Sequence, residues 1–156
     1  MLRSGKTKAK NKGMVDISEK TITKRIAVAQ ATIKLGEKAF KALINGDCPK
    51  GDVLETSKIA GIMAAKATPA MIPLCHPLEL NQISISHQID KKRKSVDITA
   101  EVSYEGKTGV EMEALAAVSI AALTIYDMMK WADKGMVITD TRLLHKSGGR
   151  SGVYTR

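Results

Sequence analysis

A carboxylate and an ammonium group stand three residues apart in the last third of the chain. Asp127 and Lys130 follow a stretch, Ala114 to Tyr126, that contains no charged residue. If this stretch is helical, the two side chains share one face of the helix. Such a pair can transfer protons in a catalytic site or form an ordinary ion pair, and the spacing alone leaves both interpretations open.

Two further carboxylates, Glu111 and Glu113, stand at the beginning of the same stretch. Glu113 and Asp127 lie on nearly the same helical face, but the helical rise separates them by roughly 21 Å. One small substrate does not span that distance. Either the two ends belong to different sites, or a second copy of the chain brings one helix start near another helix end. Stabilisation of the helix dipole, worth ~0.5 kcal/mol, is the simpler role for the acids.

His76 is the next candidate, because Pro77 disfavours a helical conformation for the residue before it. A histidine held in an extended segment suits a general acid or a hydrogen-bond donor, although a purely structural role is the alternative. Cys75 points to the other side of an extended chain, so a Cys–His nucleophilic pair is not expected. His87 and His145 show no ligand spacing, and no metal site is predicted.

Two lysines beside glycines form the third candidate. Lys50 precedes Gly51, and Lys146 precedes the run Ser147-Gly148-Gly149-Arg150-Ser151-Gly152. Backbone N–H groups of a glycine-rich loop can approach an anion, and neighbouring cations supply charge. The run lacks the order of a Walker A loop, and a flexible C-terminal tail is the alternative.

The helices and strands that must position these residues are predicted from the periodicity of apolar residues and from turn and capping residues. Alternation over Arg25–Leu35 favours a strand with one small-residue face, with a helix as the alternative because alanine favours it. Two alternating segments around Lys91-Lys92-Arg93-Lys94 predict a β-hairpin. The remaining expected elements are a helix over Glu37–Asn45 ending at Gly46, a helix over Val53–Ala67 capped by Asp52 with apolar positions Ile59, Met63 and Ala67, a long helix ending near Gly135, and a strand over Met136–Leu144.

This order of elements predicts an α+β fold in which helices pack on one face of an antiparallel sheet. Residues 14–156 are expected to form a single domain, and residues 1–13 a disordered basic tail. The tail and the basic turn at 91–94 account for the formal charge of +9. Solvated surface is the ordinary role for both basic runs, and nucleic-acid contact is the alternative.

Two lone cysteines, Cys48 and Cys75, form no motif and predict a reducing, cytoplasmic setting. The N-terminus lacks the apolar region of a secretory signal. The uncharged part of the long helix is shorter than the ~20 residues that span a bilayer, so no membrane protein is predicted. A nucleic-acid-binding protein is not favoured either, because no aromatic cluster for base stacking occurs on a predicted strand.

Several motifs together resemble the family of molybdenum cofactor biosynthesis protein C, the cyclic pyranopterin monophosphate synthases. The resemblance runs in order from about residue 14 to residue 152 and includes several long motifs. These motifs are Met14-Val15-Asp16-Ile17, Lys50-Gly51-Asp52-Val53, Ile72-Pro73-Leu74-Cys75-His76-Pro77-Leu78, Lys107-Thr108-Gly109-Val110-Glu111-Met112-Glu113-Ala114-Leu115, Ala122-Leu123-Thr124-Ile125-Tyr126-Asp127-Met128 and Lys146-Ser147-Gly148-Gly149.

The resemblance implies a phosphorus–oxygen lyase that acts on 3',8-cyclo-7,8-dihydro-GTP, the product of a radical SAM GTP cyclase. The expected reaction rearranges the purine-derived rings into a pyranopterin, closes a cyclic phosphate and releases pyrophosphate. The resemblance also implies a ferredoxin-like α+β fold. The expected assembly is a homohexamer, a trimer of dimers, with sites at subunit interfaces. No cofactor is implied; Mg²⁺ often accompanies a triphosphate, and the sequence leaves its presence open.

The resemblance also assigns roles to residues. It implies that Asp127 is the main acid–base group with Lys130 as its neighbour, and that Lys50 and His76 act in the same composite site. It places six residues along the substrate: Leu74, Cys75, His76, Glu111, Met112 and Glu113. It places Arg25, Lys50 and Lys146 at the triphosphate or in catalysis beside it. Arg150 stands where the family more often has lysine, and an arginine is a poor proton donor, so only binding is expected of it.

Overall fold

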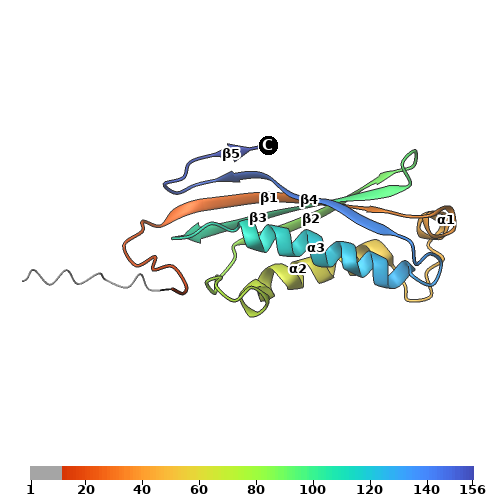
Figure 1. The fold of residues 1–156 in the computed structure, drawn as a ribbon, viewed down its shortest axis with the longest axis horizontal. Coiled ribbons are helices and arrows are strands. Elements are labelled where there is room, and N and C mark those ends of the chain that lie inside the picture. Colours follow the sequence, from red (N-terminus) through yellow and green to blue (C-terminus); the bar gives the residue numbers. More distant parts are fainter. Residues whose placement is uncertain (1–11) are drawn as a thin grey trace, which may run out of the picture.

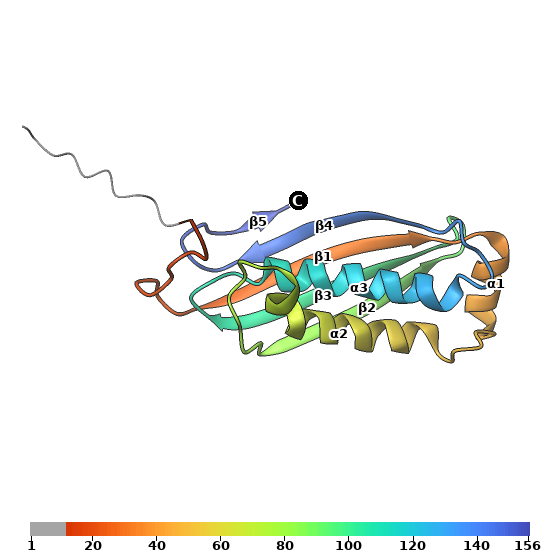
Figure 2. The ribbon, with the colours of Figure 1, turned by 60° about the horizontal axis from the view of Figure 1, so that its bottom comes forward.

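A five-stranded antiparallel sheet forms the body of the molecule in the computed structural model, which describes residues 12–156. The strand order is β2-β3-β1-β4-β5; helices α2 and α3 cover one face, and α1 lies at one end (Figure 1, Figure 2). The predicted α+β class is therefore confirmed, whereas the predicted disordered tail at 1–13 lies almost entirely outside the described residues. The elements are β1 (Thr23–Lys34), α1 (Glu37–Asn45), α2 (Val53–Met71), β2 (Gln82–Asp90), β3 (Ser95–Gly106), α3 (Glu111–Met129), β4 (Val137–Ser147) and β5 (Tyr154–Thr155).

The central strand β1 has the small-residue face that its sequence predicts. Ala27, Ala29, Ala31 and Ile33 are fully buried, and the residues between them are more exposed, apart from the nearly buried Thr32. Period-two burial is that of a strand, so the strand prediction is confirmed and the helical alternative is wrong. The small side chains allow α3 to pack closely against the middle of the sheet.

The predicted hairpin is formed by β2 and β3, whose residues pair in antiparallel register from Gln82 opposite Ser103 to Asp90 opposite Ser95. Its loop contains Lys94 at a φ of 52°. Arg93 holds the loop through ion pairs with Asp90 at 2.6 Å and Asp97 at 2.8 Å. One cation of the basic turn is thereby neutralised locally.

Helix α3 is shorter than predicted and ends at Met129, not near Gly135. The last helical bond is donated by Lys130 N to Tyr126 O, after which Ala132 N turns back to Met129 O. The Asp133 carboxylate then accepts from Gly36 N at 2.8 Å, so the chain leaves the helix to meet the end of β1. By length and composition α3 could span a membrane, but half of the relevant window is buried, as in the core helix of a soluble protein.

Helix α2 is longer than predicted and continues through Pro69 to Met71. The proline lacks the N–H that would bond the Ala65 carbonyl, so one helical bond is lost, but Ile72 N still donates to Thr68 O at 2.9 Å. Small and polar side chains of α2 are buried: Ser57, Gly61, Ala64, Ala65 and Thr68. The apolar repeat Ile59, Met63 and Ala67 instead faces outward, with Met63 63% exposed.

Gly61 marks the closest approach of α2 to its neighbours. A Cβ atom there would overlap Cδ1 of Ile85 and would lie 3.0 Å from the Ala117 carbonyl oxygen and 3.3 Å from Ala121 Cβ. We expect Gly61→Leu to lower the free energy of unfolding by about 1–3 kcal/mol, because the added side chain overpacks this contact. Urea denaturation measures the change. The exposed Lys66 of the same helix provides the control, and Lys66→Leu is expected to stay within about 0.5 kcal/mol of the wild type.

His87 of β2 is held by a polar contact beneath α2. The Ser57 hydroxyl donates to Ala121 O at 3.0 Å, so it can only accept from His87 Nε2, at 3.1 Å. Burial lowers the pKa of His87, and the nearby Lys58 ammonium lowers it further, against smaller opposing effects of Glu55 and Asp52. His87 is therefore neutral in the folded protein near neutral pH.

A depressed pKa in the folded state makes the free energy of unfolding depend on pH. The unfolded chain binds the proton more tightly, so stability is highest above the ordinary histidine pKa of about 6.5 and falls as the pH is lowered through the folded value. One such group contributes a slope of at most about 1.4 kcal/mol per pH unit. Thermal unfolding between pH 7.5 and pH 5 should show a smaller loss in His87→Gln, and an unchanged slope would contradict this assignment.

Candidate active site

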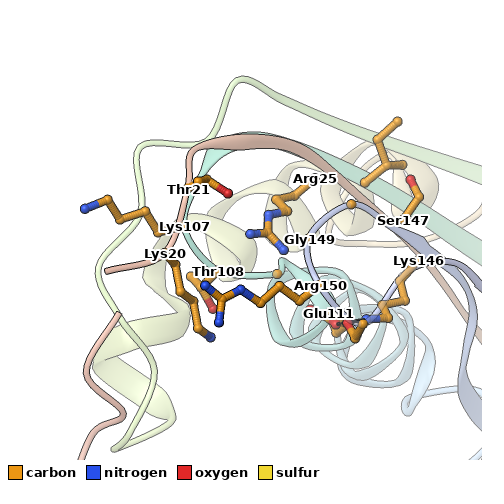
Figure 3. Close-up of a pocket in the computed structure, with 14 residues that line it drawn as sticks. Lys20, Thr21, Arg25, Lys107, Thr108, Glu111, Lys146, Ser147, Gly149 and Arg150 are labelled. Carbon is orange, nitrogen blue, oxygen red and sulfur yellow. Dashed lines mark hydrogen bonds and ion pairs between the residues drawn. The ribbon is translucent and has the colours of Figure 1, made fainter. Parts of the chain in front are cut away.

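A cavity of about 360 Å³ opens where the start of β1, the end of β4 and the start of α3 meet. Five cationic side chains and one carboxylate, Glu111, are among the residues that line it (Figure 3). The cations are Lys20, Arg25, Lys107, Lys146 and Arg150. We call this the phosphate cavity, because such an excess of positive charge favours a polyanionic ligand.

Arg25 is the most constrained of these cations, with only 8% of its surface exposed. Its Nε donates to Gly106 O at 3.3 Å, and among residues 12–156 no carboxylate pairs with it. Its guanidinium group lies against Gly149, where a Cβ atom would overlap it, and a Cβ atom on Gly148 would overlap the Lys24 carbonyl oxygen. A buried cation without an acidic partner is suited to receive an anion.

The glycine run after Lys146 belongs to an ordered turn, so the alternative of a flexible tail is wrong. Strand β4 extends to Ser147, beyond its predicted end at Leu144, and the short strand β5, which the sequence analysis missed, pairs with it. Gly148 and Gly149 have φ values of 96° and 75°, which glycine adopts without strain. Lys146 Nζ contacts the Ser151 hydroxyl and lies 3.8 Å from a Glu111 oxygen.

A second cavity of about 260 Å³ adjoins the first and shares Lys20, Thr108, Gly109 and Glu111 with it. We call this the ring cavity, because its walls include apolar side chains and few charges. It brings together the six residues that the sequence analysis places along the substrate: Leu74, Cys75, His76, Glu111, Met112 and Glu113. The two segments that supply them, the loop after α2 and the first turn of α3, are far apart in sequence.

Burial raises the pKa of two acidic groups in the ring cavity. Glu113 is 3% exposed, and burial raises the pKa of its carboxyl group, with the neighbouring Glu111 adding to the effect. Burial also raises the pKa of the Cys75 thiol, with Glu113 as a further cause. Cys75 is therefore a wall of the cavity and not an activated nucleophile. His76 donates from Nε2 to the Val15 carbonyl at 2.8 Å.

Lys50, Asp127 and Lys130 form a separate cluster at the far end of α3. Asp127 accepts from Lys50 Nζ at 2.6 Å and from Lys130 Nζ at 2.8 Å. These two hydrogen bonds, first from Lys130 and then from Lys50, lower the pKa of Asp127 to about 2. The same contact raises the pKa of Lys130. A carboxylate between two ammonium groups is a charged acceptor at neutral pH.

The predicted site residues therefore fall into two groups at opposite ends of α3. Glu111, Met112 and Glu113 begin the helix and Asp127 ends it, in agreement with the separation expected from the helical rise. The sequence analysis assigned no role to Lys20, Lys107 or Thr108, which line the phosphate cavity. Lys107 and Thr108 could have been predicted to line the cavity, because they belong to the same motif as Glu111.

The described part of the chain holds no group of three His, Cys, Asp or Glu side chains able to bind a metal ion. Glu111 is the one carboxylate among the residues lining the phosphate cavity. A Mg²⁺ ion arriving with a triphosphate would therefore take most of its ligands from phosphate oxygens and water.

Fold and cavities together define an α+β protein that presents a cationic cavity beside a more apolar one, as expected for binding a phosphorylated ring compound. A profile of the MoaC family matches residues 14–149, and the chain belongs to this family. The family suggested by the sequence motifs is thus confirmed.

Curated relatives match along nearly their whole length. The cyclic pyranopterin monophosphate synthase of Methylobacterium nodulans is 54% identical over 141 residues, covering 90% of this chain and 88% of the relative. The protein of the same name from Syntrophomonas wolfei is 52% identical, covering 92% and 91%. That of Staphylococcus carnosus is also 52% identical, covering 94% and 91%.

Proposed function

We propose that this protein is a cyclic pyranopterin monophosphate synthase, a phosphorus–oxygen lyase of molybdenum cofactor biosynthesis. Its substrate would be 3',8-cyclo-7,8-dihydro-GTP, supplied by a radical SAM cyclase, and its products cyclic pyranopterin monophosphate and pyrophosphate. The observation that supports this most directly is the pair of adjoining cavities at the start of α3, one cationic and one more apolar. Membership of the MoaC family and the names of its relatives agree with it.

The ring cavity suits the fused rings of the substrate. Leu74 and Met112 provide apolar contact area, and His76 and Glu113 provide hydrogen-bonding groups. Burial raises the pKa of the Glu113 carboxyl group above its ordinary value, which favours the proton-carrying form that ring opening and reclosure require. We assign Glu113 and His76 to this part of the reaction.

The phosphate cavity suits the triphosphate. Arg25 offers a buried guanidinium group, and Lys146 and Arg150 add charge from the glycine-rich turn. Cations fixed around a leaving group stabilise the negative charge that develops on it as the bond to pyrophosphate breaks. Lys20 and Lys107 extend the same positive surface toward the ring cavity.

A second copy of the chain would complete the site. Antiparallel contact of two α3 helices about a two-fold axis near Ser119 and Ile120 would place Glu113 of one copy level with Asp127 of the other. The outer surface of the helical layer is apolar enough for such contact: Leu123 is 52% exposed, Ile59 51% and Met63 63%. We propose a dimer with two such composite sites, and a hexamer built as a trimer of dimers.

In the composite site Asp127 needs its lysines to move before it can accept a proton. A carboxylate with a pKa of about 2 is a weak base, because Lys130 and Lys50 stabilise its charge. The triphosphate offers these ammonium groups another anionic partner. Substrate binding would therefore raise the pKa of Asp127 and place Lys50 and Lys130 beside the phosphates, which supports roles for all three in catalysis.

The purified protein supplied with the cyclised GTP intermediate tests this function. Formation of the pterin and release of one pyrophosphate per turnover are expected, followed by fluorescence after oxidation of the pterin and by a pyrophosphate assay. Absence of both products would overturn the proposal. The two free cysteines, one buried and one half-buried, fit the reducing cytoplasm, where we expect the enzyme to work.

A further inference from the structure

We propose that residues 15–20, here called the strap, are a movable cover of the ring cavity, and that Lys107 is the positioning residue that holds it. This inference rests on the proposed function for its substrate. It concerns two features that the assignment of catalytic roles leaves unused: the irregular segment before β1, and the lysine that begins the connection from β3 to α3.

The strap is folded on itself and can move as one unit. The Asp16 carboxylate accepts from Ser18 N at 2.9 Å and from the Ser18 hydroxyl at 2.6 Å. Lys20 N then donates to Ile17 O at 3.1 Å. These bonds form a compact turn that contains no helix or strand. Both bonded amides, Ser18 N and Lys20 N, lie next to the Ser18 carbonyl, so a contact at that carbonyl also stabilises the turn.

Two polar contacts attach the strap to the body of the protein. Lys107 Nζ donates to Ser18 O at 2.7 Å, and His76 Nε2 donates to Val15 O at 2.8 Å. Apolar burial adds little, because Val15 is 65% exposed and only Ile17 of the strap is half-buried. Segments with so few buried contacts open at low free-energy cost.

The strap lies across both cavities. Val15, Ile17 and Lys20 line the ring cavity, and Lys20 lines the phosphate cavity as well. Lys20 and Lys107 lie on the same side of the phosphate cavity (Figure 3). Because Lys107 holds the turn at Ser18, two residues before Lys20, it determines where the Lys20 ammonium group meets the phosphates.

Substrate binding is expected to break the His76–Val15 contact of the strap and to leave the Lys107–Ser18 contact intact. The proton on His76 Nε2 is donated to the Val15 carbonyl and is not available to a bound ring in this arrangement. A substrate that uses this proton must displace the Val15 end of the strap. The contact at Lys107 stays in place and acts as the pivot, so that the strap swings open at Val15 while Lys20 stays near the phosphates.

Hydrogen exchange of the ligand-free protein tests the attachment without any turnover. In Lys107→Met, which keeps most of the length of the side chain but removes its donors, the two hydrogen-bonded amides of the strap, Ser18 N and Lys20 N, are expected to exchange about tenfold faster than in the wild type. Lys107→Arg retains donors and should restore slow exchange. The matched control is Lys91→Met, because Lys91 lies in the hairpin loop at the other end of the molecule and should leave exchange unchanged.

Steady-state kinetics test the consequence for the substrate. Lys107→Met is expected to raise KM about tenfold and to change kcat less than about threefold, since it misplaces a binding group. Asp16→Ala, which disrupts the turn without lining either cavity, should raise KM in the same direction. A raised KM with unchanged exchange would make Lys107 a direct phosphate ligand and overturn the proposal. Faster exchange with an unchanged KM would also overturn it.

A wild-type protein that does not convert the substrate would overturn the proposed function alone, because the exchange result does not depend on turnover.

Discussion

Replacing Asp127 by asparagine is expected to lower kcat by about 10²–10⁴-fold, the usual contribution of a positioned acid–base group. Asparagine keeps the shape of the side chain but removes the charge that holds Lys50 and Lys130 at 2.6 Å and 2.8 Å. The two lysines would then share one neutral amide oxygen in place of a charged carboxylate, and the site would lose its proton acceptor. Pyrophosphate release from the cyclised GTP intermediate measures the effect.

Folding should survive this substitution, because about half of the Asp127 side chain is exposed. Exposed ion pairs contribute little to stability, so the midpoint of thermal unfolding should change only slightly. Asp47→Asn provides the matched control, since Asp47 is also exposed and its side chain makes no hydrogen bond within the described residues. Turnover of Asp127→Asn within tenfold of the wild type would remove Asp127 from the chemistry.

The helical face of α2 illustrates the limit of periodicity as a guide. Apolar residues at Ile59, Met63 and Ala67 correctly indicated a helix, but they lie on its outer side. Gly61 and Ser57 face the neighbouring helix, because close approach of α2 and α3 requires small side chains there. The apolar period indicates that the segment is helical. It does not indicate which face of the helix packs within the same chain and which face is available to another chain.

Helix ends were predicted less well than helices because tertiary contacts override local signals. Gly135 looked like the end of α3, yet the helix stops at Met129, where Asp133 reaches back to Gly36 N. The helix over Glu37–Asn45 was predicted correctly, since Gly46 adopts the left-handed conformation, with a φ of 73°, that caps a helix locally.

Site residues that belong to sequence motifs could be predicted. Site residues that an irregular loop brings to the cavity could not. Leu74, Cys75 and Glu113 meet in the ring cavity as their motifs implied. Lys20 escaped notice because the segment around it has no periodicity, and only contacts such as that from Lys107 to Ser18 fix its place. The separation of Glu113 from Asp127 followed from helical rise alone.

Mixing two inactive variants is expected to restore activity, because the separation along α3 requires two chains for one site. His76→Ala removes a group from the ring cavity, and Asp127→Ala removes one from the other end of the helix. In a mixed dimer, one composite site contains both substitutions and the other contains neither. Random re-association of equal amounts should therefore give about one quarter of the wild-type activity.

The mixing experiment distinguishes a site shared by two chains from a site within one chain. A shared site gives about one quarter of the wild-type activity, and a site within one chain gives no activity. Each variant is purified, the two are combined under conditions that exchange subunits, and pyrophosphate release is compared with that of each variant treated alone. A control mixture of His76→Ala with the double variant His76→Ala/Asp127→Ala should stay inactive, since no dimer in it has an intact site. If the first mixture is also inactive although subunits have exchanged, His76 and Asp127 do not meet across an interface, and the composite site is wrong.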